Sequence, residues 1–292
     1  MEEQKNSMNI QWYPGHMTKT RRMMEEDLKL VDAVCEILDA RIPISSRNPD
    51  IDAICGKKPR MVILNRIDMA DADLVSRWSN YFKDRGMAVI RTDCKSRKGI
   101  NTFAPAVRQL LAEKLQRYAE KGQVGRPLKL MVVGIPNVGK STFINQIAGR
   151  KGAKAENRPG VTRGKQWVNV DGGLLLLDTP GILWPKFDDP EVGMRLAYTG
   201  AVKDDILDTE TLGCHLMELL AREYPQALVE RYKIEIPTKV DGWELLQAAG
   251  RKRGFLVSGG EVDTERMAKV LLEEYRSCKL GTFTLERPEE LA

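Results

Sequence analysis

The sequence predicts an α/β fold with a doubly wound, mostly parallel sheet, followed by a small all-helical domain. Over residues 1–185, short apolar runs typical of buried strands alternate with longer runs of helical periodicity. After residue 185 the strand patterns end and helical patterns dominate. We therefore expect two domains, residues 1–185 and residues 186–292, which suits a chain of 292 residues.

The expected elements of the first domain alternate along the chain, as a parallel sheet with crossover helices requires. Strands are expected over residues 33–38, 60–64, 87–91, 129–133 and 174–177, and helices over residues 18–31, 71–85, 100–121 and 142–148. Glycine and proline mark residues 122–127 as a linker. In the second domain, helices are expected over residues 209–223, 225–232, 242–249 and 264–278.

The most specific motif directly follows the expected strand over residues 129–133. Residues 134–141 match GxxxxGK[ST], a phosphate-binding loop between a strand and a helix. Gly134 and Gly139 let backbone N–H groups surround phosphate oxygens, Lys140 supplies positive charge, and Ser141 offers a hydroxyl to Mg²⁺. The other loop residues expected to contact the nucleotide are Asn137, Val138 and Thr142.

Two later segments fit the same nucleotide site. The apolar run over residues 174–177 ends in Asp178-Thr179-Pro180-Gly181, where the carboxylate can join the Mg²⁺ shell and the N–H of Gly181 can reach a γ-phosphate. Thr162 lies in a loop with Gly and Pro and is the candidate switch residue for Mg²⁺ and γ-phosphate. Either segment alone could be an ordinary loop. The phosphate-binding loop upstream favours the interpretation that both belong to a nucleotide-binding site.

A base-binding motif follows the expected strand over residues 60–64. Asn65-Arg66-Ile67-Asp68 is close to the NKxD pattern, with Arg66 in place of the usual Lys. Asp68 would accept hydrogen bonds from the ring N–H and exocyclic amine of guanine, a pattern of donors that adenine lacks. The backbone contact to the guanine carbonyl is expected, from position alone, at Asp93 and Cys94.

The base-binding motif precedes the phosphate loop, whereas in ordinary GTPases it follows. This order, together with Trp12-Tyr13-Pro14-Gly15-His16-Met17, Asp39-Ala40-Arg41-Ile42-Pro43 and the residues after Asp178, resembles the circularly permuted GTPases of the RbgA/YlqF family. The resemblance covers essentially the whole chain. It implies a cytoplasmic bacterial GTPase that binds GTP and GDP and promotes late assembly of the large ribosomal subunit. Its partner would be the precursor particle of rRNA and ribosomal proteins, and hydrolysis would release it.

Hydrolysis needs a group that orients the attacking water. The position after DxxG, a Gln in many GTPases, is Ile182, which cannot hydrogen-bond water. His16 could orient the water or accept its proton; from the residues alone it could equally be structural, and the resemblance favours catalysis. Since His16 is far from the phosphate loop in sequence, we expect a slow enzyme that the ribosomal particle accelerates. In related GTPases that lack the Gln, an Asn at the position of Asn137 helps to hold a K⁺ ion beside the phosphates. The alternative is that Asn137 only stabilises the turn of the loop.

Composition restricts the class of protein and its partners. Residues 1–185 carry 31 Lys and Arg against 20 Asp and Glu, which suits a phosphate-rich partner but also ordinary solubility. In the acidic second domain, Arg251-Lys252-Arg253-Gly254 could be only a solvated loop or could contact RNA phosphates, and the resemblance favours the RNA contact. The absence of a signal peptide or of an apolar run of about 20 residues predicts no membrane partner, and the scattered cysteines predict a reduced, cytoplasmic protein.

We expect a monomer off the ribosome. A P-loop kinase or ATPase and a GTP-binding scaffold with negligible turnover remain as alternatives.

Overall fold

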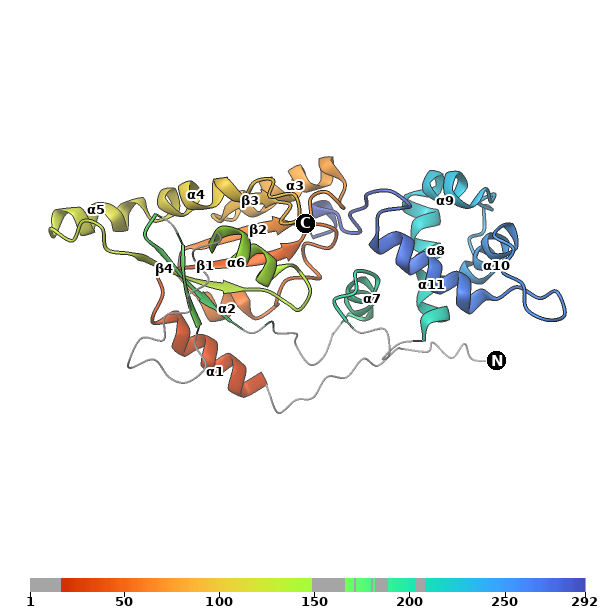
Figure 1. Cartoon of the computed structure of the whole chain (residues 1–292), viewed down its shortest axis with the longest axis horizontal. Coiled ribbons are helices and arrows are strands. Elements are labelled where there is room, and N and C mark those ends of the chain that lie inside the picture. The colour runs from red at the N-terminus through yellow and green to blue at the C-terminus, as the bar shows by residue number, and fades with distance from the viewer. Residues whose placement is uncertain are drawn as a thin grey trace. The chain divides into compact units, whose positions relative to one another are not determined.

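The structure is a computed structural model that describes residues 17–148, 166–170, 172–179, 181, 189–202 and 208–291. Its described residues form two compact units. One contains residues between 17 and 181 together with residues 283–291, and the other contains residues 189–282 (Figure 1). The first holds the sheet, and the second is helical. In this part of the chain, no helix is long and apolar enough to cross a membrane.

The first unit is built on a six-stranded sheet with the order β3-β2-β1-β4-β6-β5. Only the β5–β6 pairing is antiparallel, and every other neighbouring pair is parallel. The strands are β1 (Ala33–Asp39), β2 (Arg60–Asn65), β3 (Ala88–Thr92), β4 (Leu128–Val133), β5 (Gln166–Val170) and β6 (Leu174–Asp178). The expected doubly wound, mostly parallel fold is therefore confirmed.

Two registers bring functional segments together at the carboxyl edge of the sheet. Asp39, the last residue of β1, lies opposite Asn65, the last residue of β2. On the other side of the phosphate-loop strand, Asp178 at the end of β6 lies opposite Val132. Ligands of open parallel sheets bind outside this edge, so the two registers place the predicted motifs around one position.

Helices cover both faces of the sheet. In the first unit they are α1 (Met17–Leu28), α2 (Ile51–Cys55), α3 (Ala72–Asp84), α4 (Phe103–Leu110), α5 (Ala112–Glu120) and α6 (Lys140–Ala148), with the short 3-10 helices η2 (Ile100–Thr102) and η4 (Pro288–Leu291). Val34 and Leu38 point to the same face of β1 and pack into clusters with α1, α2 and α3. Because crossovers are right-handed, α4 and α6 cover the opposite face, where Phe103 meets Phe143 edge to face at 5.2 Å.

Some elements differ from the sequence-based expectations. The single helix expected over residues 100–121 is divided into η2, α4 and α5, with a break at Leu111. Leu111 is buried while α5 has no buried residue, so the chain turns away from the core at this point. The strand β5 and the helices α2 and α7 were not expected. β5 is only five residues long, and its burial pattern is not a regular alternation because the adjacent Trp167 and Val168 are both buried.

The second unit packs its helices around a core on α8 and α11. Its helices are α7 (Pro190–Tyr198), α8 (Thr209–Glu223), α9 (Pro225–Tyr232), α10 (Gly242–Lys252) and α11 (Thr264–Arg276). Gly213 on α8 allows a close approach to α11, because a Cβ there would lie 2.5 Å from the side chain of Ala268. Glu274 on α11 is buried and accepts hydrogen bonds from Arg231, Tyr232 and Arg253.

The chain returns to the first unit after α11. Residues 283–291 group with the sheet, whereas the sequence-based boundaries placed everything from 186 to 292 in the helical domain. In Figure 1 the dark-blue end of the chain lies beside α3, and η4 contacts that helix. The physical reason is local: the backbone N–H of Phe283 donates to the carbonyl of Met69 at 3.2 Å, and that of Leu285 donates to Arg41 at 2.8 Å.

Candidate nucleotide-binding site

The phosphate loop connects β4 to α6. Gly139 has φ +95°, and a Cβ there would lie 2.3 Å from the side-chain nitrogen of Asn65. The loop therefore needs glycine for both its backbone angle and its contact with the base-binding motif. Lys140 is buried at the first turn of α6, and the following Ser141 and Thr142 are exposed. This leaves both hydroxyls open to solvent at the helix N-terminus, where an anion is favoured.

Lys140 forms an ion pair with Asp178, across the space between α6 and the end of β6. The pair joins the two side chains that the sequence assigned to phosphate and to Mg²⁺. Their charges neutralise one another in a partly buried position, where an isolated ammonium would be costly. The pairing keeps both groups beside the phosphate loop and ready to exchange partners.

The DxxG segment packs directly onto the phosphate loop. A Cβ on Gly181 would lie 3.1 Å from the backbone nitrogen of Pro136, so any side chain there would crowd the phosphate loop. The hydroxyl of Thr179 donates to the carbonyl of Val132 at 2.8 Å and fixes the start of the segment to β4. Both contacts place the backbone of Gly181 beside the loop.

Asn65 joins the base-binding motif to the rest of the site. Its amide nitrogen donates to the carbonyl of Val138 in the phosphate loop at 2.8 Å. Its amide oxygen accepts from the hydroxyl of Thr92 at 3.2 Å and from the backbone N–H of Cys94 at 3.3 Å. One buried side chain thus holds together three segments that the sequence assigned separately.

Arg66 adds a second link between the same segments. Its backbone is left-handed, with φ 63°, and its guanidinium donates to the carbonyl of Asn137 at 2.5 Å. The same guanidinium lies 3.4 Å from a carboxylate oxygen of Asp39. Arginine at this position therefore bridges the phosphate loop and the end of β1.

Asp39 is buried and heavily hydrogen-bonded. One carboxylate oxygen accepts from the backbone and Nε of Arg41, both at 3.0 Å, and the other accepts from its Nη2 at 2.7 Å. Burial acts to raise the pKa of Asp39, but the charge and hydrogen bonds of Arg41, with the charge of Arg66, lower the pKa below its ordinary value. Asp39 is therefore a buried anion between two arginines.

Asp68 and Asp93 form the acidic end of the site. Asp68 is exposed, and its pKa is raised, first by the partial burial of its carboxyl and then by the negative charge of Asp93. Asp93 is held in its turn because its carboxylate accepts from the backbone N–H of Lys95 at 2.8 Å. An exposed carboxylate near a second one favours a ligand that presents N–H donors, since these stabilise its charge.

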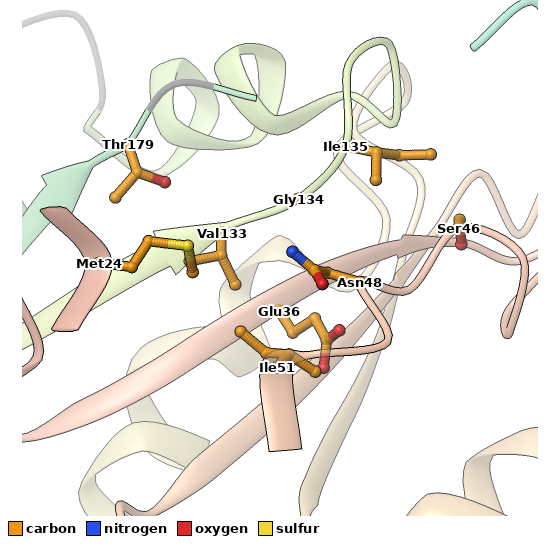
Figure 2. Close-up of a pocket in the computed structure, with 9 residues that line it drawn as sticks. All are labelled: Met24, Glu36, Ser46, Asn48, Ile51, Val133, Gly134, Ile135 and Thr179. Atoms are coloured by element: carbon orange, nitrogen blue, oxygen red, sulfur yellow. The ribbon is translucent and has the colours of Figure 1, made fainter. Parts of the chain in front are cut away.

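A small pocket lies behind the phosphate loop (Figure 2). Met24 from α1 lines it together with Gly134, Ile135 and Thr179, so α1 packs close to both the phosphate loop and the DxxG segment. Glu36 also lines the pocket. Burial raises the pKa of Glu36 even though the charges of Arg47 and Arg60 act to lower it. Met24 also belongs to a buried core cluster, and this packing fixes α1, whose first residue directly follows His16.

Two residues of the sequence-based site, His16 and Thr162, lie outside the described residues, as does Ile182 after DxxG. The remaining ones gather at the carboxyl edge of the sheet. Within the described ranges, no group of three or more His, Cys, Asp and Glu side chains forms a metal-binding cluster. The sequence-based site did not include Asp39 and Arg41, which appeared only as part of a family motif.

Comparisons with known proteins agree with this geometry. Residues 129–233 match the family model described as "50S ribosome-binding GTPase". "Ribosome biogenesis GTPase A" of Priestia megaterium is 48% identical over 285 residues, which are 97% of this chain and 98% of that protein. Among solved structures, GDP-bound "TM YlqF" has TM-score 0.67 and 27% identity, covering 92% of this chain and 100% of that one. GNP-bound YlqF from T. maritima has TM-score 0.63 and 26% identity, covering 93% and 99%.

The fold and the site define a P-loop GTPase whose motifs are circularly permuted. The base-binding segment after β2 precedes the phosphate loop in sequence yet contacts it in space. The chain belongs to the ribosome biogenesis GTPase A family, to whose members it is similar over nearly its full length. A kinase or an ATPase acting on a metabolite, the enzymatic alternative from sequence, has no support among these relatives.

Proposed function

We propose that this GTPase binds the immature large ribosomal subunit in its GTP state, promotes late assembly, and is released by hydrolysis. The proposal that the protein binds a guanine nucleotide rests on the hydrogen bond from Asn65 to the carbonyl of Val138. This bond connects the base-binding motif to the phosphate loop. The names of the relatives support the ribosomal part. YlqF, whose structures contain GDP and GNP, supports the nucleotide.

Guanine would be selected by Asp68. Its carboxylate would accept from the ring N–H and the exocyclic amine. The backbone of Asp93 and Cys94 would contact the guanine carbonyl, and for this the N–H of Cys94 would share its long 3.3 Å bond to Asn65 with the base. Arg66 and Ile67 would support the base on either side of this contact. The test is Asp68→Asn, which should exchange the preference for guanine nucleotides for a preference for xanthine nucleotides. A variant that still prefers GDP would remove Asp68 from base recognition.

The residues around the phosphate loop fit a Mg²⁺ ion. Ser141, Thr162 and Asp178 would provide the hydroxyl and carboxylate oxygens that Mg²⁺ prefers, and the ion would neutralise phosphate charge. On nucleotide binding, Lys140 would exchange Asp178 for the β- and γ-phosphates. Asn137 is the proposed ligand of a K⁺ ion, which rates in KCl and in NaCl would test: equal rates would exclude a K⁺ requirement.

Catalysis is assigned to His16, which would orient the attacking water. In the circular order of the fold, α1 follows the DxxG segment, because it leads into β1 beside the phosphate-loop strand. His16 directly precedes α1, so it takes the place in that order where an unpermuted GTPase carries its catalytic Gln. Met24 of α1 lines the pocket behind the phosphate loop, which supports this placement.

RNA contact by the helical unit would use the exposed end of α10. Arg251 and Lys252 are exposed there, whereas Arg253 lies over the ring of Tyr232 at 5.3 Å and pairs with Glu274. We therefore assign phosphate contact to Arg251 and Lys252 and a packing role to Arg253. The protein would act in the cytoplasm, as a monomer when it is off the ribosome.

The decisive experiment is co-sedimentation with large-subunit precursor particles. The protein should pellet with the particles in a non-hydrolysable GTP analogue and remain in the supernatant with GDP. Equal binding in both nucleotides would contradict release by hydrolysis. Single-turnover hydrolysis with and without the particles completes the test. Acceleration by the particles supports a gated enzyme, and no measurable turnover in either case favours the scaffold alternative.

A further inference from the structure

The segment after the helical unit lies across the two loops that border the guanine end of the site. Its backbone contacts both loops: the N–H of Phe283 donates to Met69, just after the base-binding motif, and the N–H of Leu285 donates to Arg41, just after β1. The hydroxyl of Thr284 connects the same loops. It donates to the carbonyl of Ala40 at 3.1 Å and accepts from the N–H of Asp71 at 3.2 Å.

Glu286 is buried and attaches this segment to the first unit. Its carboxylate accepts from the backbone N–H groups of Ile44 at 2.6 Å and Ser45 at 2.9 Å, and from the hydroxyl of Ser45. Its own carbonyl accepts from the indole N–H of the fully buried Trp78 at 3.0 Å. Successive backbone N–H groups form a good anion site, so the carboxylate holds the turn of residues 43–47 as an N-cap holds a helix.

The turn of residues 43–47 also positions Asp39. The hydroxyl of Ser46 accepts from the backbone N–H of Asp39 at 3.0 Å. Asp39 lies 3.4 Å from the guanidinium of Arg66, which reaches the phosphate loop. A set of polar contacts therefore runs from the buried Glu286 through the turn and the buried Asp39 to the partly exposed Arg66 of the base-binding motif.

We propose that the C-terminal segment 283–291 is part of the guanine site, with Glu286 and Thr284 as positioning residues for Asp68 and Arg66. The inference rests on the proposed role of Asp68 in binding guanine. Without the segment, the loops over residues 40–46 and 69–71 lose their shared partner. Asp68, one residue before Met69, then loses the fixed position that recognition of two guanine N–H groups requires.

The test compares GDP with inosine diphosphate, which lacks the exocyclic amine. Glu286→Ala should weaken GDP binding about tenfold, because it removes charged hydrogen bonds from a buried loop. Binding of inosine diphosphate should weaken less, so the preference for GDP should shrink. A variant that is merely less well folded would lose both ligands equally and keep the preference.

Thr284→Val provides a gentler second variant of nearly the same shape, which should show the same change in preference to a smaller degree. Glu289→Gln is the matched control, since Glu289 lies in the same segment but only pairs with the exposed Arg77. It should bind both nucleotides within twofold of the wild type. Hydrogen exchange at Ile44, Ser45 and Asp71 should accelerate in Glu286→Ala and not in the control.

The outcomes separate the two proposals. A wild-type protein without preference for GDP over inosine diphosphate would overturn the role of Asp68 itself. A wild type that prefers GDP, with Glu286→Ala and Thr284→Val retaining the full preference, would overturn the positioning role of the C-terminal segment alone.

Discussion

The side chain of Asn65 donates a 2.8 Å hydrogen bond to the carbonyl of Val138, although 73 positions separate the two residues in the chain. In this protein, that bond is the point where the end of β2 meets the phosphate loop. The parallel register of β2 with β1, and of β1 with β4, brings the two segments to one edge of the sheet. Permutation has changed the order of the motifs along the chain but not their meeting in space.

Replacing Asn65 should therefore weaken nucleotide binding more than it weakens the fold. Asn65→Asp places a carboxylate oxygen against the carbonyl of Val138, and we expect GDP affinity to fall roughly ten- to hundredfold. Titration with a fluorescent GDP analogue measures this. Asn101→Ala, at an exposed asparagine on η2, is the control and should change affinity little. Normal binding by Asn65→Asp would show that the bond is not needed.

Binding of GDP should depend on pH through Asp68. Its pKa is raised by partial burial and by Asp93, and only the deprotonated carboxylate can accept both guanine N–H groups. Affinity should therefore begin to fall at a higher pH than the ordinary Asp value of about 3.9 implies. Asp93→Asn removes the like charge and should move this fall to lower pH, which calorimetric titrations between neutral and acid pH would detect. An unchanged pH profile in Asp93→Asn would contradict the coupling.

The buried charge of Asp39 should stabilise the first unit above the ordinary Asp pKa. Because the pKa is lowered in the folded state, this stabilisation is complete above the unfolded-state value of about 3.9 and is lost as the pH falls through the folded-state value. Asp39→Asn should cost about 3 kcal/mol at neutral pH, since Arg41 is left buried without its counter-charge.

Urea unfolding at neutral and acid pH measures this difference. The gap between Asp39→Asn and the wild type should narrow below about pH 4, where Asp39 of the unfolded wild-type chain begins to be protonated while Asp39 of the folded chain stays charged. Asp73→Asn, at a carboxylate that is 82% exposed, serves as the control and should match the wild type at both pH values. A gap of constant size across the pH range would argue that charge is not the cause.

His16 should affect turnover and not nucleotide affinity. His16→Ala removes the group proposed to orient water, so we expect at least about a hundredfold slower hydrolysis, with GDP affinity within twofold. Single-turnover assays with ribosomal particles are the measurement. The only other histidine, His215, is exposed on α8, and His215→Ala should keep the wild-type rate. Equal rates in His16→Ala and wild type would remove His16 from the mechanism.

Much of the fold followed from sequence because its signals were local. The apolar runs predicted β1, β2, β3, β4 and β6, and the glycine spacing predicted the phosphate loop. The meeting of Asn65 with the phosphate loop could be expected from parallel-sheet topology together with the motifs. The contacts of Glu286 could not be expected from the sequence. Glu286 lies in a segment without periodicity, and its carboxylate binds mainly backbone N–H groups, which leave no trace in the pattern of side chains. The break at Leu111 was missed for a similar reason, since it depends on what the residue packs against.

Because residues 283–291 belong to the first unit, the chain is joined to that unit both before and after the helical unit. If the connection between Gly181 and Asp189 were cut, the C-terminal fragment would still hold the sheet through Thr284 and Glu286. We therefore expect the two pieces to stay associated after such a cut, although the peptide chain between them is broken.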